Sequence, residues 1–339
     1  MFIKTLIILI SSLTLSATTV NIKIPKVPEV PKVEAIVPSL HIKKDGDYKT
    51  NEQIIKESTQ TKTVHFSNHV APKIIEDKDE AGTIALVGDV KDGRVSAYLH
   101  APLLPIKNIK QILEKAGFKI LSTYKIDKKG KVSSIVFTNP NLTTYASKKN
   151  RGFAGSLRVT VDTKDKLISI TNPIYVMAAF LQDEYDETVA KKTLSQLRDA
   201  FGNLKNADDI LKFRILSNYQ FMKGMPRYTD MQVIKKTPSK QLLENARKSK
   251  KIVYEQTLDN GAIVIGVKLS KRTSKFIKKT GYKNAGLLPY PVLIEDGEAK
   301  IMDPKYYIAI MYPMLKMSQF MKISTVPGAI HKDIDKIFR

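Results

Sequence analysis

The sequence predicts an α+β protein made of two similar modules, each an antiparallel sheet packed with helices, arranged as a pseudo-symmetric pair. Two observations lead to this prediction. Strand-type and helix-type runs alternate after residue 81, and the same order of runs returns about 131 residues later. Short strands joined by tight turns, with helices packed on the sheet, are typical of α+β folds.

Residues 1–17 have the features of a secretory signal peptide. Lys4 supplies the positive charge, an apolar run follows over 6–15, and small residues suit cleavage near Ala17. The apolar run is shorter than the roughly 20 residues needed to span a bilayer. We therefore expect an exported protein, located in the periplasm or outside the cell. An uncleaved leader that acts as a membrane anchor is the alternative.

Residues 18–80 are predicted to form a tether that is rich in Pro and Lys and partly disordered. Prolines recur every third residue over 25–31, and proline favours an extended, semi-rigid chain. His65 and His69 have the spacing of two metal ligands on one helix face, but the surrounding residues are not helix-like. No metal site and no cofactor are therefore predicted.

The first module is predicted over 81–205. Pro105 suits the first turn of a helix, and Gly117 suits its C-terminal end. Strand-type runs follow at 119–126 and 132–138. This order of helix, strand and strand begins the α+β unit.

The second module is predicted over 237–339. Pro238 opens a helix, and strand-type runs follow at 251–256 and 262–267. The order of elements is therefore the same as in the first module.

Helices are also predicted over 186–201 and 208–223, where apolar residues recur at helical spacing. The second of these helices belongs to a helical, Met-rich connector over 206–236. The Met and aromatic residues of 220–228 favour core packing over a ligand surface.

An internal repeat supports the two-module prediction. Residues 144–180 align with 275–311 at a constant offset of 131, without gaps. The matches include Gly155 with Gly286, Pro173 with Pro304, and Tyr175 with Tyr306. A fused pair of such modules would mimic a symmetric dimer, with a cleft or a shared sheet between the copies.

Four segments also carry a family resemblance: 111–121, 136–140, 170–173 and 287–297. The last is an apolar, proline-containing strand that enters an acidic hairpin turn. Each module resembles the bacterial family called domain of unknown function 302. The resemblance covers about 95–200 and 235–339, although 157–161 lacks the prolines of that strand. It implies a compact α+β fold with an antiparallel sheet and a tendency to pair, and it implies no established activity.

Composition limits the partners. With 56 Lys and Arg against 33 Asp and Glu, the net charge is +23, which favours anionic partners. We expect anionic envelope components or a small ligand, no nucleic acid, at most peripheral membrane contact, and a monomer or homodimer. Because the lysines are spread evenly, a plain solvated surface is the alternative. The absence of Cys excludes disulfides, thiolate metal sites and Cys nucleophiles.

No catalytic residue is assigned, since no Gly-x-Ser-x-Gly motif or phosphate loop occurs. The leading hypothesis is a non-catalytic envelope module that binds a small or lipid-like ligand. The alternatives are a hydrolase-like periplasmic enzyme with a site around His100, and a structural protein that binds acidic envelope partners. The candidate ligand-binding residues are Tyr98, His100, Asn139, Arg151, Asn172, Tyr175, Tyr282 and Tyr306.

Overall fold

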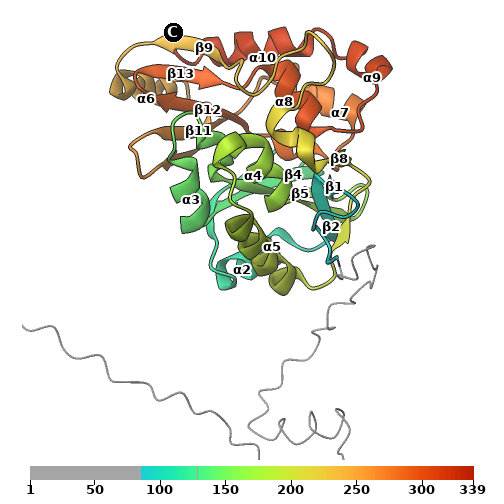
Figure 1. Ribbon diagram of the computed structural model, residues 1–339. Coiled ribbons are helices and arrows are strands. Elements are labelled where there is room, and N and C mark those ends of the chain that lie inside the picture. The colour runs from blue at the N-terminus through green and yellow to red at the C-terminus, as the bar shows by residue number, and fades with distance from the viewer. Residues whose placement is uncertain (1–84, 128) are drawn as a thin grey trace, which may run out of the picture. The chain divides into compact units, whose positions relative to one another are not determined.

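Strands with an apolar residue at every second position build an antiparallel sheet from the first half of the chain (Figure 1). The computed structural model describes residues 85–127 and 129–339. The strand order is β3-β4-β5-β6-β2-β7. These strands are β2 (Tyr98–Pro102), β3 (Lys119–Lys125), β4 (Val132–Thr138), β5 (Leu157–Asp162), β6 (Leu167–Thr171) and β7 (Lys205–Asn206).

One face of this sheet is apolar. The register aligns Ile135, Val159, Ile170 and Leu99 in one row across β4, β5, β6 and β2, and all four are fully buried. Helices α2 (Ile106–Lys115) and α5 (Glu187–Phe201) pack against each other beside the sheet, and Leu194 of α5 approaches Leu99 at Gly88. The helices of this half are α2 (Ile106–Lys115), α3 (Pro140–Ala146), α4 (Pro173–Leu181) and α5 (Glu187–Phe201).

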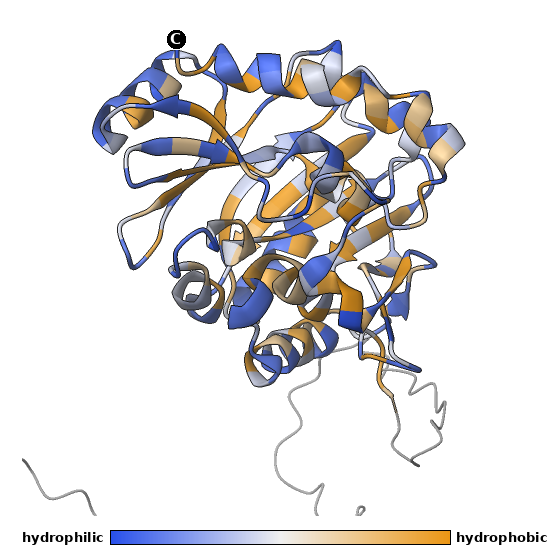
Figure 2. Cartoon of the chain, turned by 45° about the horizontal axis from the view of Figure 1, so that its top comes forward, coloured by the Kyte–Doolittle hydropathy of each residue, from blue (hydrophilic) through white to orange (hydrophobic). Residues whose placement is uncertain are grey.

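The second half forms its own antiparallel sheet, in the order β10-β11-β12-β13-β9. Its strands are β9 (Gln232–Lys236), β10 (Ile252–Thr257), β11 (Ile263–Val267), β12 (Tyr290–Glu295) and β13 (Glu298–Ile301). Its helices are α6 (Ser239–Lys248), α7 (Ile277–Thr280), α8 (Pro304–Met311), α9 (Met317–Met321) and α10 (Val326–Asp335). Figure 2 shows that apolar residues concentrate on the strands between the outer helices. Because both sheets are antiparallel and are packed with helices, the protein is α+β.

The two sheets have corresponding strand orders. If strands are counted from β2 in the first half and from β9 in the second, the second sheet reads 2-3-4-5-1, and the first reads the same with β7 added at its edge beside β2. The hairpin loops differ, because Asp162 pairs with Leu167 whereas Glu295 pairs with Glu298. The first loop is thus two residues longer. The gap-free alignment of 144–180 with 275–311 is therefore wrong across this hairpin.

The predicted helix after Pro105 is confirmed as α2, and Gly117 follows it with a φ of +84°. The helix predicted over 186–201 is confirmed as α5, where the Asp186 carboxylate accepts a hydrogen bond from the Val189 amide at 3.1 Å. Such an N-cap satisfies an amide that the helix itself leaves free.

The helix predicted over 208–223 is wrong. This segment instead forms β8 (Ile210–Lys212), which pairs with β1 (Arg94–Ser96), followed by the 3-10 helix η3 (Phe213–Asn218). Ile215 and Met222, two residues of the expected helical stripe, are exposed. Pairing with β1 therefore outweighs the helical spacing of the apolar residues.

The predicted signal peptide at 1–17 and tether at 18–80, together with His65 and His69, lie outside the described residues. Within 85–127 and 129–339, no helix combines the length and the apolar character needed to cross a bilayer.

Short 3-10 segments from each half lie against the sheet of the other. The segment η1 (Gly152–Gly155) packs on β11 and β12, where a Cβ atom at Gly152 would lie 2.6 Å from Leu293 and 3.1 Å from Val264. The segment η5 (Ala285–Leu287) packs on β5 and β6. The second sheet thus meets Gly152 with apolar side chains, and Gln256 beside them donates to the Gly155 carbonyl at 2.8 Å.

Two tyrosine hydroxyl groups join the halves through α4 and α8. Tyr175 of α4 donates to the Ile310 carbonyl at 2.7 Å, and Tyr306 of α8 donates to the Ala179 carbonyl at 3.4 Å. Both acceptors belong to the last turn of a helix, where carbonyl groups have no partner within the helix. Each helix therefore caps the C-terminal end of the other.

We expect Tyr175→Phe to lower the free energy of unfolding by about 1–3 kcal/mol, because the buried Ile310 carbonyl loses its donor. Urea denaturation would measure the change. Tyr282→Phe is the matched control, since the Tyr282 hydroxyl has no described hydrogen bond and its side chain is partly exposed. Equal destabilisation by both variants would contradict a stabilising role for the hydrogen bond between Tyr175 and the Ile310 carbonyl.

Candidate functional site

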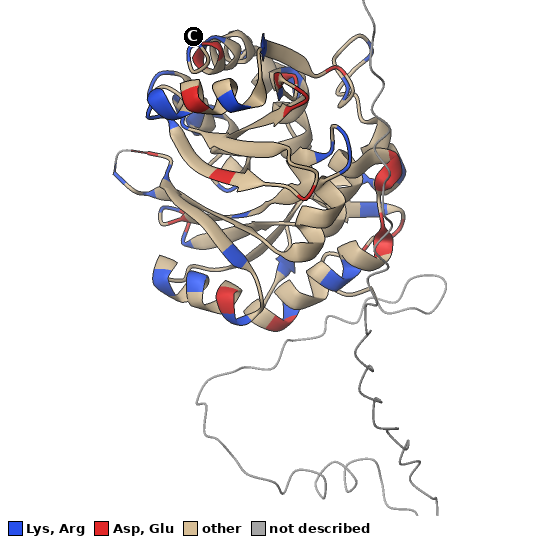
Figure 3. Ribbon diagram, turned by 90° about the vertical axis from the view of Figure 1, so that its left-hand side faces the viewer, with Lys and Arg blue, Asp and Glu red and all other residues tan. Residues whose placement is uncertain are grey.

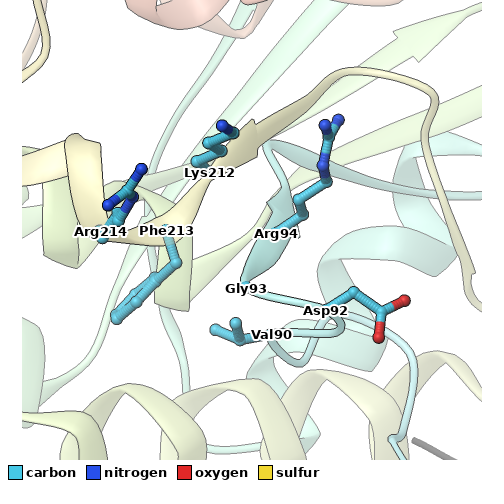
Figure 4. A pocket seen from close by; sticks show the side chains of 7 residues that line it. All are labelled: Val90, Asp92, Gly93, Arg94, Lys212, Phe213 and Arg214. Atoms are coloured by element: carbon cyan, nitrogen blue, oxygen red, sulfur yellow. The ribbon is translucent and has the colours of Figure 1, made fainter.

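A surface pocket lies where β1 meets β8 and η3. Its volume is about 310 Å³. Figure 4 shows the side chains of Arg94 and Lys212 standing above the strands, while Phe213 and Val90 lie beneath them. We name this site the basic pocket; its lining residues are Val90, Asp92, Gly93, Arg94, Lys212, Phe213 and Arg214.

Strand pairing places the cations of the basic pocket together. Arg94 is directly opposite Lys212 in the β1–β8 register, and the Phe213 amide donates to the Gly93 carbonyl at 2.8 Å. Arg214 follows at the start of η3. Two strands that are more than a hundred residues apart in the sequence therefore combine to form the site.

The basic pocket has an excess of positive charge. Arg94, Lys212 and Arg214 are exposed and take part in none of the ion pairs of the described residues. The Asp92 carboxylate points away from Phe213 and Arg214 (Figure 4). Elsewhere, basic residues are interspersed with acidic ones over several elements (Figure 3). Three unpaired cations beside an apolar floor suit an anionic ligand.

Of the sequence-predicted site residues, Tyr98, Tyr175 and Tyr306 lie buried between the two sheets. The Tyr98 hydroxyl donates to the Met311 carbonyl at 2.8 Å, in the same last turn of α8 that Tyr175 caps. Burial raises the pKa of all three hydroxyls, so they remain neutral donors at ordinary pH. The structure thus brings these three together as links between the halves.

Asn139 and Asn172 are helix caps. The Asn139 side chain accepts from the Leu142 amide at 2.9 Å at the start of α3, and Asn172 accepts from the Ile174 amide at 3.0 Å at the start of α4. The Asn172 amide group also donates to the Gly88 and Ser96 carbonyls. Each Asn-Pro pair therefore places a cap directly before a proline at the first helical position.

Arg151 and Tyr282 lie in separate contacts. Arg151 forms an ion pair with Asp183 at 2.6 Å, and its guanidinium lies 5.6 Å from the centre of the Tyr228 ring. The Lys164 ammonium lies 5.9 Å from the centre of the Tyr282 ring. No contact between Arg151 and Tyr282 is among those described, so the structure does not bring these two together.

His100 lies on β2, opposite Ser169 of β6. Its Nε2 atom is buried and has no hydrogen-bond partner among the described residues. Burial lowers the pKa of His100 from its ordinary value of 6.5, and the positive charge of Lys283 lowers it further. Asp209 and Asp208 oppose this shift. The imidazole is therefore mainly neutral near pH 7.

Sequence reasoning missed the cations of the basic pocket. Residues 212–214 were assigned to the expected helix over 208–223, which hid their position beside β1. The one available signal was the alternation of basic and apolar residues from Leu211 to Arg214, which is typical of an exposed strand. Within the described residues, no group of three or more His, Asp or Glu side chains is placed to hold a metal ion.

The comparisons with known proteins give no relative: no family model, no curated protein and no solved structure matches this chain.

We expect the stability of the folded protein to depend on the protonation of His100. Its pKa is lower in the folded state than in the unfolded chain, so the unfolded chain takes up a proton more readily. The stabilisation is therefore complete above pH 6.5 and is lost as the pH falls through the lower, folded pKa. His100→Gln should reduce the loss of stability between about pH 7 and pH 5, as measured by urea denaturation.

Titration of the His100 ring protons by NMR gives the independent check. A pKa at or above 6.5 in the folded protein would contradict this account.

Proposed function

We propose that this protein is an exported, non-catalytic binding protein that holds an anionic ligand in the basic pocket. The observation that carries the proposal is the convergence of Arg94, Lys212 and Arg214, all free of described ion pairs, on one pocket. Ionised donors bind phosphate and carboxylate groups more strongly than neutral donors do. A net charge of +23 would add long-range attraction to any anion.

The apolar floor narrows the ligand class. Val90 and Phe213 line the pocket below the cations, so a ligand with an anionic head and a short apolar part would use both surfaces. Such molecules include small or lipid-like components of the bacterial envelope. This ligand class agrees with an exported protein, which rests on the leader at 1–17.

We also propose that the two halves are paired modules related by duplication. The corresponding strand orders of the two sheets support this. So do the Tyr175 and Tyr306 hydrogen bonds, because both the donors and their acceptors, Ala179 and Ile310, are 131 residues apart. Exchange of the same contact in both directions is the pattern of a twofold interface. The resemblance to domain of unknown function 302 remains a prediction.

Hexyl phosphate tests the proposed ligand class, since it combines one phosphate with a short apolar chain. We expect calorimetric titration to show saturable binding, and we expect no binding of the neutral hexyl glucoside. Arg94→Gln or Arg214→Gln should raise the Kd about tenfold, because each removes a charge-assisted hydrogen bond.

Lys248→Gln is the control, because Lys248 is exposed on α6 and its loss changes the net charge by the same amount. It should leave the Kd unchanged within about twofold. If all three variants weaken binding equally, general charge rather than the basic pocket attracts the anion.

A further inference from the structure

The inner face of the first sheet, which meets the second half, is polar. Ser134, Thr160 and Ser169 are neighbours on β4, β5 and β6, and all three are fully buried. Arg158 lies two residues before Thr160 on β5, and residues two apart on a strand share a face. In the next row across the sheet, Arg158 lies beside Thr171 of β6, and Thr171 pairs with Tyr98 of β2.

Several polar atoms on this face have no partner. The hydroxyl groups of Ser134, Thr160 and Ser169 are buried and make no hydrogen bond with any described residue. The Arg158 Nε atom is also buried without a described hydrogen-bond partner. Buried polar groups are almost always hydrogen-bonded. So many unpartnered groups on one face indicate that something other than protein completes it.

Arg158 lies beside this row of unpartnered hydroxyl groups. It is 3% exposed and belongs to no described ion pair or cation–π contact. Arginine keeps its proton in proteins and is rarely buried without a counter-charge. Its one described side-chain hydrogen bond is a long one, in which Nη2 donates to the Tyr254 hydroxyl at 3.4 Å.

The second half brings the Tyr254 phenol, rather than any described carboxylate, to Arg158. Tyr254 reaches it because Gly266 has no side chain; a Cβ atom there would collide with the Tyr254 ring. The Tyr307 hydroxyl is buried without a partner. Burial raises the pKa of Tyr307 to about 12, against the opposing effect of Arg158. Tyr307 is therefore a neutral donor and supplies no negative charge.

We propose that Arg158, together with the hydroxyl groups of Tyr254 and Tyr307, binds a small monovalent anion between the two sheets. The guanidinium and both phenols offer donors, and the missing partner is an acceptor with one negative charge. A single guanidinium balances one charge, so a halide ion or the carboxylate of a small organic acid fits, and a multivalent anion does not. This site is separate from the basic pocket.

Thermal unfolding of the whole protein in different sodium salts, at one ionic strength, tests the proposal. Chloride and formate should raise Tm above its value in gluconate, an anion too large for the interior. The unfolding equilibrium should shift about a hundredfold when the anion is at about 100 times its Kd. Bromide, as a second halide, and acetate, as a second carboxylate, show which of these two classes of anion binds better.

Arg158→Met removes the charge and should abolish the anion dependence of Tm. Tyr307→Phe keeps the ring and removes one hydroxyl, so it should raise the anion Kd several-fold even if Arg158→Met fails to fold. Arg214→Gln, in the basic pocket, should leave the response unchanged, which separates this test from that of the proposed function.

Equal Tm values in chloride, formate and gluconate would overturn the proposal and would assign the unpartnered groups to buried water. A full anion response in Arg158→Met, or an unchanged Kd in Tyr307→Phe, would overturn it as well.

Discussion

The packing of α4 against α8 is the constraint on which the rest of the structure depends. Each helix ends inside the protein, where its last carbonyl groups have no water to bind, and each receives a tyrosine hydroxyl from the other. The Phe180 and Tyr228 rings stack with their centres 5.9 Å apart, and the centre of the Tyr306 ring lies 6.1 Å from that of Tyr228. These contacts join the C-terminal end of each helix to the other half of the protein.

Much of this fold could be predicted from local sequence, because local chemistry determines it. Pro105 and Gly117 delimit α2, and the Asp186 side chain caps α5, as their residue types favour. The failure at 208–223 has a different cause. Apolar spacing there suits a helix, but Lys212 pairs with Arg94 across more than a hundred residues, and local sequence does not identify so distant a partner.

The same distinction applies to the candidate sites. Tyr98, Tyr175 and Tyr306 lie in interior hydrogen bonds, and Asn139 and Asn172 are helix caps, although the sequence favours all five as ligand-binding residues. The basic pocket and the Arg158 face form only when distant strands meet, so no short motif marks either of them. Nothing in the sequence distinguishes Arg158 from other strand residues, because its burial without a counter-charge is visible only in three dimensions.

The two inner faces are unequal: the first sheet presents Ser134 and Thr160, and the second presents Val264 and Leu293. Two identical chains related by a twofold axis must repeat any polar face on both sides. A single continuous chain is free of that requirement. The polar groups of the second inner face, Lys300 and Glu295, form an ion pair, whereas Ser134 and Thr160 of the first have no described partner. Specialisation and stability can therefore be assigned to different parts of one molecule.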